Sequence, residues 1–478
     1  MTWHKKYLSL YLGALVLLVA SWLSLWQLGS APFWDYDEST YAQISHEALA
    51  SGQALAPTFM QKPFFEKPPL YMWEAEASAK LLGESRWSFR LPSALMGVMS
   101  VLVVMLLAFE LSRNAWAAVL AGAILTTTAP FIETARQVRL DVPVAFWVTL
   151  AAYGFVRGMR HSRWFLLFGV SVALAVLTKS VVAVFALAAA PIFALWLWDF
   201  SWLRDKYFWM SVLAAFVIGA PWHIYETLLY GNTFWRDYVG INVTTRFHEE
   251  LFNMQEVSNR DYLWYLSNFA VPWMQVFVLG IVAVATYWRH IPEQYRAGIG
   301  ACATLMLAVI VVFFAAATKA PTYLIPLYPF ASVAISLAIL GLMSKMSRSY
   351  TALLFVAIGV CFCIGFSQTI YNGFHMNPYY SQTDELSQEE KLVADQLLQN
   401  PKATWFVYGS DREVGAIMYY TQNIRPVALT GAEHPKVGDV ILMYGTQHEQ
   451  FFKNYGNMST TVLYPGSQLL LLQVVSEE

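Results

Sequence analysis

The most restrictive feature of this chain is a series of about eleven apolar runs, each near the length of roughly 20 residues that an α-helix needs to cross a bilayer. Charged residues make up 13% of the 478 residues, against about 25% in a typical soluble chain. The runs cover residues 8–28, 91–111, 115–132, 141–157, 164–178, 180–198, 208–229, 266–288, 297–317, 322–342 and 350–370. We therefore expect a mainly α, polytopic membrane protein.

The placement of basic residues predicts how the chain crosses the membrane. If the amino terminus is cytoplasmic, every inner segment contains Lys or Arg, as the positive-inside rule requires. The first run follows Lys5 and Lys6 and is long, so we interpret it as an uncleaved span and not as a signal peptide. The inner residues are Lys5, Lys6, Arg113, Arg157, Arg160, Arg163, Arg204, Lys206, Arg289, Arg296, Lys345 and Arg348. The loops 30–90 and 230–262 and the tail from 371 are then outside.

The composition changes after the last run, which predicts two domains. Residues 1–370 form the expected transmembrane domain, and residues 371–478 a small α/β domain on the outer side. Within the tail, residues 385–400 have the pattern of an amphipathic helix. Short apolar stretches at 405–408, 440–444, 461–464 and 469–475 are typical of strands separated by turn residues. Tyr408, Asp411, Arg412, Tyr419 and Tyr420 are candidate acceptor contacts, although we favour a solvated face.

The first outer loop carries unusual charge for so apolar a chain. It contains Asp35, Asp37, Glu38, Glu66 and Lys67. Apolar residues at helical spacing predict two helices lying along the interface, one from about Tyr41 and one after Pro69. Asp37 lies at the start of the first helix, where a carboxylate either caps the helix or does chemistry. A cap would also fix the position of that carboxylate.

Further ionisable residues recur at the predicted outer edges of the spans. Such groups are costly near hydrocarbon and are usually paired or functional. Lys179 and Lys319 could instead mark span ends by extending their ammonium groups to water, but their outer position runs against the inner bias for lysine. The outer-edge residues are Glu133, Arg136, Arg139, Asp141, Lys179, Arg246, His248, Glu249, Glu250 and Lys319.

One face thus combines carboxylates, cations and many aromatic side chains, which form 16% of the chain. Carboxylates can deprotonate or orient an acceptor hydroxyl, and cations can hold a phosphate and stabilise it as it leaves. Because the outer face has no nucleotides, an activated sugar donor there must be carried by a lipid. The residues favour a transferase that uses a lipid-linked phosphate donor.

The chain resembles the integral-membrane glycosyltransferases of the GT-C type. Within them it is most similar to the bacterial aminoarabinose (lipid A) transferase and protein O-mannosyltransferase-like group. Asp37-Glu38 followed by Tyr41-Ala42 looks like the first-loop acidic motif, and Leu140-Asp-Val-Pro143 like the second acidic site. Motifs in the family's order are Ala50-Ser-Gly52, Phe65-Glu-Lys-Pro68, Arg90-Leu-Pro-Ser93, Leu177-Thr-Lys179, Pro221-Trp-His223, Arg246-Phe247, Tyr262 to Tyr265, and Lys319 to Pro326.

The resemblance implies transfer from a polyprenyl-phosphate sugar on the periplasmic side of the inner membrane. It implies Asp37 as the principal catalytic carboxylate and Asp141 as a second essential acid. The expected donor- and phosphate-binding residues are Glu66, Lys67, Arg139, Lys179, Arg246, Lys319 and Tyr323, with Glu38, Tyr41, Arg136 and His248 as secondary candidates.

This chain also departs from the aminoarabinose pattern. Thr40 stands where those enzymes carry an Arg, the tail is shorter, and eleven spans replace thirteen. The departures bear on the sugar and the acceptor more than on the chemistry.

Several alternatives stay open at this stage. The expected acceptor is a lipid such as lipid A, with a protein or another surface glycan as the alternative, and a transporter of polyprenyl-linked sugars is the rival from another class. We expect no required cofactor and no nucleic-acid partner, and the scattered histidines show no metal-ligand spacing; a divalent ion near Glu66 or His248 stays an open alternative that we do not predict. Cys302, Cys361 and Cys363 lie in apolar runs, which favours small core residues over a disulfide or metal site.

Overall fold

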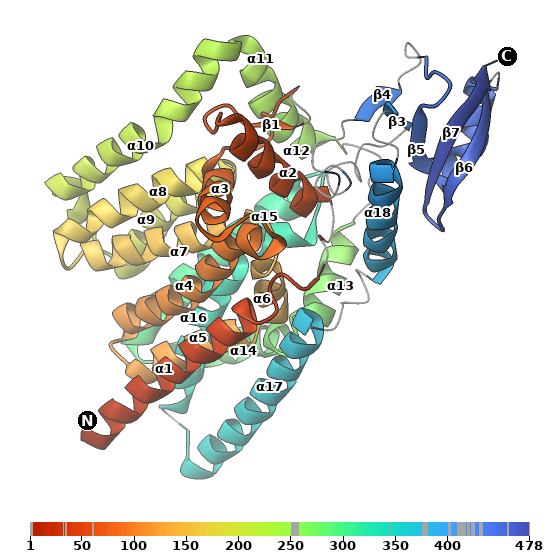
Figure 1. The fold of residues 1–478 in the computed structure, drawn as a ribbon. Coiled ribbons are helices and arrows are strands. Elements are labelled where there is room, and N and C mark those ends of the chain that lie inside the picture. Colours follow the sequence, from red (N-terminus) through yellow and green to blue (C-terminus); the bar gives the residue numbers. More distant parts are fainter. Residues whose placement is uncertain are drawn as a thin grey trace. The chain divides into compact units, whose positions relative to one another are not determined.

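The computed structural model is mainly helical and divides into two compact units (Figure 1). Unit 1 comprises residues 1–26, 65–71 and 91–375, and unit 2 residues 27–64, 72–90 and 376–478. The structure describes residues 3–31, 33, 36–59, 62–249, 258–344, 346–374, 381–399, 403–408, 417, 421, 426–429, 434–456 and 458–477. Asp35, Glu250, Lys345, Asp411, Arg412, Tyr419 and Tyr420 lie outside these residues.

The first half of unit 1 consists of apolar helices and a few short helical turns between them. They are α1 (Trp3–Leu25), α4 (Arg86–Ser112), α5 (Ala115–Thr126), α6 (Ala129–Ala135), α7 (Asp141–Gly158), η1 (Ser162–Trp164), α8 (Phe165–Lys179), α9 (Val184–Leu197), η2 (Ser201–Arg204) and α10 (Lys206–Tyr230). Helix α8 packs on α7 and on α10, and α9 on α7 (Figure 1). At Gly169 a Cβ atom would meet the carbonyl oxygen of Ser211 at 2.0 Å, so only glycine permits this approach of α8 to α10.

The second half of unit 1 begins with short elements and ends with four apolar helices. They are α11 (Asn232–Trp235), the π-helix η3 (Arg236–Thr245), α12 (Arg246–His248), α13 (Asn259–Phe269), α14 (Trp273–Tyr287), η4 (Trp288–His290), α15 (Glu293–Ala315), η5 (Pro321–Leu324), α16 (Leu327–Met343) and α17 (Arg348–Phe374). Each of the eleven apolar runs of the sequence overlaps at least one of these helices.

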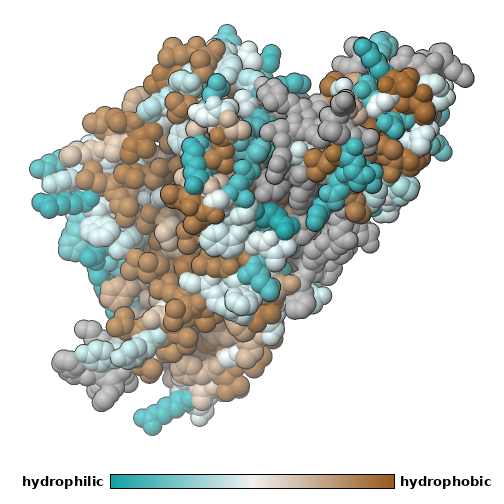
Figure 2. All heavy atoms as spheres, viewed as in Figure 1, coloured by the Kyte–Doolittle hydropathy of each residue, from teal (hydrophilic) through white to brown (hydrophobic). Residues whose placement is uncertain are grey.

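Many apolar side chains of unit 1 face outward, as expected for contact with lipid. Among the described residues six helices are long and apolar enough to cross a membrane, or up to eight if each of two bent helix pairs counts as one span. On α10, Leu213, Phe216 and Leu228 are 62%, 67% and 80% exposed. Figure 2 shows hydrophobic residues spread widely over the visible surface of the helices. The predicted polytopic, mainly α membrane fold is confirmed at this level.

Unit 2 includes most of the charged first loop. It contains α2 (Tyr36–Ser51), a two-stranded hairpin of β1 (Thr58–Phe59) and β2 (Lys62–Pro63), and most of α3 (Leu70–Leu82). Tyr41, Ile44 and Ala48 form one buried face of α2, as their spacing predicts. On α3 the face predicted from Leu70, Trp73, Ala77 and Leu81 is the more exposed one, since Leu81 is 83% exposed, whereas Tyr71, Ala75 and Ala79 are buried.

The tail of unit 2 forms a mixed sheet covered by helices. Its elements are α18 (Ser381–Gln399), β3 (Trp405–Tyr408), β4 (Pro426–Leu429), β5 (Val440–Tyr444), η7 (Gly445–Gln447), α20 (His448–Asn454), β6 (Met458–Pro465) and β7 (Leu469–Glu477). The strand order is β4-β3-β5-β7-β6, parallel from β4 to β5 and antiparallel from β5 to β6. Four of these strands were predicted, and β4 was missed.

Alternating residues of the strands build two small cores. Trp405 and Leu442 contact Val393 and Leu397 of α18 in one apolar cluster, whereas Phe406 and Ile441 form another with Phe451 of α20. Successive strand residues point to opposite faces, so one helix covers each face.

Glu389 ties α18 to the turn between β6 and β7. Its carboxylate accepts hydrogen bonds from the Ser467 hydroxyl (2.6 Å) and from the backbone N–H groups of Ser467 (2.8 Å), Gln468 (3.1 Å) and Leu469 (2.7 Å). Burial alone would raise the pKa of this carboxyl, but the hydrogen bonds outweigh it and hold the pKa below the usual 4.5.

We predict that Glu389→Gln loosens this turn. Because hydrogen bonds to a charged group contribute about 1.5–3 kcal/mol each, the opening free energy of the Ser467–Leu469 amides should fall by at least about 1.5 kcal/mol. The measurement is hydrogen exchange of the full chain, corrected for intrinsic rates, with the exposed Glu449→Gln as control. In the unmutated chain the stabilisation should be complete above pH 4.5 and be lost as the pH falls through the depressed pKa. Equal protection in both variants would contradict the role of Glu389.

Candidate active site

A pocket of about 100 Å³ in unit 1 gathers charged residues from segments far apart in the chain. Residues 66–68 form one side, the end of α8 and the start of the following turn another, and η3 with α12 a third. The end of α15 and residues 318 and 323 complete the pocket. The lining residues are Glu66, Lys67, Pro68, Lys179, Ser180, Val181, Val182, Tyr238, Asn242, Val243, Arg246, Phe247, Val312, Phe313, Ala316, Thr318 and Tyr323.

Backbone hydrogen bonds fix the segments that carry these side chains. The N–H of Thr318 donates to the carbonyl of Arg246 (3.0 Å), and that of Ala317 to Phe247 (2.9 Å). The hydroxyl of buried Tyr262 donates to the carbonyl of Ala320 (3.0 Å) and accepts from its N–H (2.9 Å). The segment before η5 is therefore held on both sides without regular secondary structure.

Glu66 anchors two cations at the pocket wall. Its Oε2 lies 3.0 Å from Nη2 of Arg246 and 3.8 Å from Nζ of Lys67. Lys67 Nζ also donates to the carbonyl of Glu66 (3.3 Å). One carboxylate orients two cations here, so these three groups together carry a net positive charge beside the pocket.

A second ion pair joins the first residue of α7 to the last residue of α8. Nζ of Lys179 is 2.7 Å from Oδ1 of Asp141, the first residue of α7. The same ammonium is 4.6 Å from the ring centroid of Tyr323, a cation–π distance. Asp141 is 5% exposed and Lys179 lines the pocket. The carboxylate therefore holds Lys179 in a defined position at the pocket wall.

Two pocket residues, Tyr238 and Asn242, were missed by the sequence analysis. Both lie on η3, whose i→i+5 hydrogen bonding is rare and is associated with functional sites. Burial raises the pKa of Tyr238 to about 12, although a hydrogen bond with Ser180 opposes the shift. Tyr238 is thus a neutral hydroxyl near pH 7. Only the position of Asn242 in the charged outer loop could have marked it.

Four residues predicted at the donor site contact protein groups outside the pocket. Lys319 Nζ donates to the carbonyl of Ala316 (2.6 Å), and Arg139 Nε to the side chain of Gln137 (2.7 Å). Arg136 donates to the carbonyl of Leu23 (2.7 Å) and lies over the Phe374 ring. Nδ1 of His248 lies 2.9 Å from the carbonyl of Thr244. None of the four lines the pocket.

In unit 2, the residue after Asp37 is held by a buried guanidinium fork. Arg90 Nε and Nη2 donate to Oε1 (2.7 Å) and Oε2 (3.0 Å) of Glu38, and its Nη1 donates to the carbonyls of Leu28 and Ala31 (2.9 Å each). Arg90 is 1% and Glu38 0% exposed. Asp37 itself is half-buried in the first turn of α2, where Glu38 fixes the backbone beside it.

The arrangement in the pocket suits an anion. Lys67, Lys179 and Arg246 place three cations around one cavity, with Glu66 and Asp141 as their protein partners. A phosphate group has the charge and the acceptor geometry that Arg and Lys bind. Within the described ranges no group of three or more His, Cys, Asp or Glu residues is arranged to hold a metal ion.

We predict that Arg90→Lys destabilises the protein by about 1.5–3 kcal/mol, because lysine keeps the charge of the buried pair but loses at least one hydrogen bond to a charged group. Lysine cannot bond both carboxylate oxygens and both carbonyls from a planar fork. The midpoint of thermal unfolding in detergent measures the change, with Arg86→Lys, one turn earlier on α4, as control. If the two variants unfold at the same temperature, the buried fork does not have this role.

The first half of the chain matches a known protein family. Residues 8–233 match the family of dolichyl-phosphate-mannose-protein mannosyltransferases. An undecaprenyl phosphate-alpha-4-amino-4-deoxy-L-arabinose arabinosyl transferase of Enterobacter sp. (strain 638) is 27% identical over 340 residues, which are 68% of this chain and 58% of that protein. The corresponding transferase of Edwardsiella ictaluri is 28% identical over 325 residues, 64% of this chain and 55% of that protein. The chain thus spans less than two thirds of the length of these curated relatives.

Solved structures share the fold. ArnT from Cupriavidus metallidurans bound to undecaprenyl phosphate superposes with a TM-score of 0.75 at 18% identity, covering 97% of both chains. The Archaeoglobus fulgidus oligosaccharyltransferase in the apo form gives a TM-score of 0.59 at 12% identity, over 98% of this chain and 75% of that one.

Proposed function

This chain belongs to the GT-C glycosyltransferases, in the group that includes the protein mannosyltransferases and the bacterial aminoarabinose transferases, and from this premise we propose that it transfers a sugar from a polyprenyl phosphate. The acceptor in this proposal is a lipid such as lipid A. The observation that carries the proposal is the pocket in which Lys67, Lys179 and Arg246 converge.

The pocket supplies the groups that a leaving polyprenyl phosphate needs. Arg246 offers a planar set of donors, and Lys67 and Lys179 offer mobile ammonium groups. Negative charge grows on the phosphate as its bond to the sugar breaks, so these cations bind the transition state more strongly than the intact donor. Asp141 acts through Lys179, and Glu66 acts through Arg246, as positioning residues. Tyr238 also lines the pocket, and its hydroxyl lies 3.0 Å from Nε2 of His223.

We assign Asp37 as the catalytic carboxylate on the acceptor side. The acceptor oxygen attacks the anomeric carbon, the bond from that carbon to the phosphate oxygen breaks, and the configuration inverts. If the acceptor is a hydroxyl, its proton passes to Asp37. If the acceptor is a phosphate, no proton needs to be removed and Asp37 orients the acceptor. In both cases the Arg90–Glu38 pair fixes the helix turn that carries Asp37.

The proposed topology has about eleven crossings, with the pocket and the tail on the periplasmic side of the inner membrane. It rests on the basic residues at alternate ends of the apolar runs. The proposed domain division remains 1–370 for the transmembrane catalytic part and 371–478 for the outer α/β domain. Under this topology Lys319, Arg139, Arg136 and His248 lie around the same outer end and form a secondary cationic layer, with Tyr323 against Lys179.

The proposal has an alternative acceptor. Thr40 replaces an arginine of the aminoarabinose enzymes, so the same chemistry on a protein or another surface glycan is the second reading. Both readings use the same donor pocket.

The test of the function is mass spectrometry of lipid A, proteins and surface glycans from cells with and without the gene. We expect one acceptor class to lose a mass of one sugar when the gene is deleted. Complementation by the unmutated gene should restore this mass, whereas Asp37→Asn, present in the membrane at equal amount, should not. No glycan change of any kind, or full restoration by Asp37→Asn, would overturn the proposal.

We predict that Lys67→Gln lowers kcat/KM for the polyprenyl-phosphate donor at least about tenfold, because one charge-assisted hydrogen bond contributes about 1.5–3 kcal/mol. The measurement is an initial-rate assay with purified protein and synthetic donor. Arg348→Gln removes an exposed charge at the start of α17 and serves as the control. Equal rates for the two variants would contradict phosphate binding at this pocket.

A further inference from the structure

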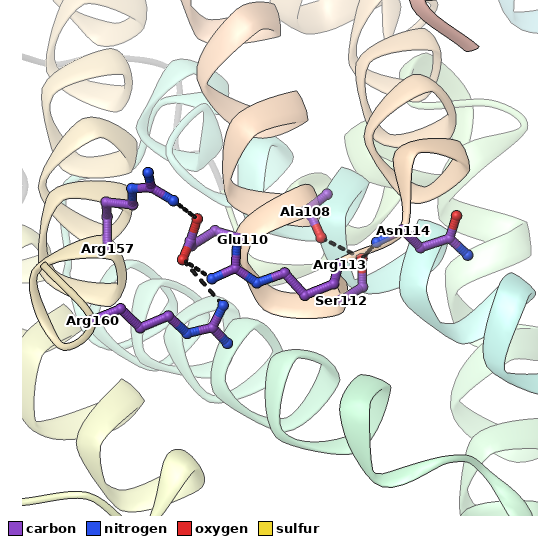
Figure 3. Close-up of polar contacts among 7 residues, drawn as sticks. All are labelled: Ala108, Glu110, Ser112, Arg113, Asn114, Arg157 and Arg160. Carbon is purple, nitrogen blue, oxygen red and sulfur yellow. Dashed lines mark hydrogen bonds and ion pairs between the residues drawn. The ribbon is translucent and has the colours of Figure 1, made fainter. Parts of the chain in front are cut away.

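A second basic site lies at the opposite end of α7 from Asp141. Sixteen residues separate Asp141 from Arg157, which is about 24 Å along a helix. Here Glu110, only 2% exposed, accepts from three arginines: Arg113 Nη2 (2.6 Å), Arg157 Nη1 (2.7 Å) and Arg160 Nη1 (3.2 Å). Figure 3 shows these guanidinium groups converging on the single carboxylate. One buried acid therefore orients three cations and neutralises one of them.

The surplus positive charge extends over the neighbouring turns. The segments 110–113, 157–164 and 199–207 contain Arg113, Arg157, Arg160, Arg163, Arg204 and Lys206 against Glu110, Asp199 and Asp205. Helix α10 contacts both η1 and η2, so these segments are neighbours in unit 1. Asp199 and Asp205 accept backbone N–H bonds from Ser201 and Tyr207.

A pocket of about 440 Å³ lies among these basic residues. It is lined by Arg157, His161, Ser162, Arg163, Trp164 and Tyr207. The Nε of Arg157 is enclosed and has no hydrogen-bond partner in the part of the chain that the structure describes. Arg163 and His161 are exposed. The pocket is thus bordered by the half-buried Arg157 and by exposed basic side chains that water or a ligand can reach.

The turn that carries these residues is rigidly supported. At Gly158 a Cβ atom would meet the ring of Phe165 at 2.4 Å, so α7 and α8 approach closely just beside the pocket. The Arg157 guanidinium also lies over Trp164, 5.7 Å from the ring centroid. The cations are therefore presented in a fixed arrangement.

The side of the pocket formed by α10 continues into an apolar surface. Met210 and Ile218 follow Tyr207 by three and eleven residues and lie on its side of the helix, 49% and 37% exposed. Trp164 is 38% exposed, and Trp and Tyr are the residues that favour the boundary between membrane and water. A ligand held here has its charge among arginines and its apolar part along α10.

We propose that this pocket binds the headgroup of an anionic diacyl phospholipid. The phosphodiester accepts hydrogen bonds from Arg157 and Arg163, which line the pocket, with Arg160 adding positive charge from beside Glu110, and the acyl chains lie along α10. A soluble phosphate would match the cations but not the exposed apolar side of the pocket. Basic pockets between membrane helices bind anionic headgroups in this manner. The site is separate from the donor pocket, and its existence does not depend on the proposed reaction.

The experiment is native mass spectrometry of the full-length protein, purified in detergent and titrated with phosphatidylglycerol, phosphatidylcholine or inorganic phosphate. We expect the unmutated protein to retain phosphatidylglycerol in preference to phosphatidylcholine. Arg163→Gln, and Arg160→Gln combined with Arg163→Gln, should weaken phosphatidylglycerol binding by about fivefold and about tenfold or more, since each basic residue near an anionic lipid contributes about 1 kcal/mol.

Arg289→Gln is the matched control because Arg289 is an exposed basic residue of η4 that does not line the pocket. It should bind phosphatidylglycerol like the unmutated protein. Arg163 is exposed, so the single variant keeps the test valid if the double variant is unstable. Equal retention of both lipids, equal weakening by Arg289→Gln, or displacement of phosphatidylglycerol by inorganic phosphate at the same concentration would overturn the proposal.

Discussion

The cost of placing charge away from water governs the structure of this protein. An isolated buried charge is strongly unfavourable, so it persists only with a partner of opposite sign or with several hydrogen bonds. Arg90 meets this requirement with both oxygens of Glu38 and two carbonyl groups, and Lys179 meets it with Asp141. These pairs fix α2 within unit 2 and, within unit 1, the start of α7 against the end of α8. The backbone beside both candidate acids, Asp37 and Asp141, is therefore held by ion pairs and not by apolar packing alone.

The same pairing leaves a useful surplus of positive charge. Glu66 orients Arg246 and lies near Lys67, while Asp141 orients Lys179, so the carboxylates position three cations without neutralising all of them. Glu110 does the same for three arginines at the far end of α7. In both sites carboxylates, of which Asp141 and Glu110 are buried and Glu66 is half-buried, orient a group of cations toward the proposed anion. Pre-orientation matters because little reorganisation is then required when the anion binds or when its charge increases.

The sequence predicted the mainly helical membrane fold, the helix break after Lys179 and four of the five strands of the tail, because apolar runs and alternating patterns depend on local residues. It missed β4, whose first residue is Pro426, and the π-helix η3, since neither has a periodicity that separates it from loop. The sequence identified the charged residues that line the pocket, but it did not show which of them form ion pairs with each other. Glu66 and Arg246 are 180 residues apart, and no local pattern relates them. Lys319, predicted beside the donor, donates to the carbonyls of Ala316 and Ala317 after α15, a contact that the sequence did not indicate.

The most direct test of the account is an experimental structure of the protein in a lipid bilayer with undecaprenyl phosphate bound. The account predicts that the phosphate lies within hydrogen-bond distance of Lys179 and of Lys67 or Arg246, with the Lys179–Asp141 pair retained. A phosphate bound elsewhere, with Lys67, Lys179 and Arg246 contacting only protein groups, would contradict it.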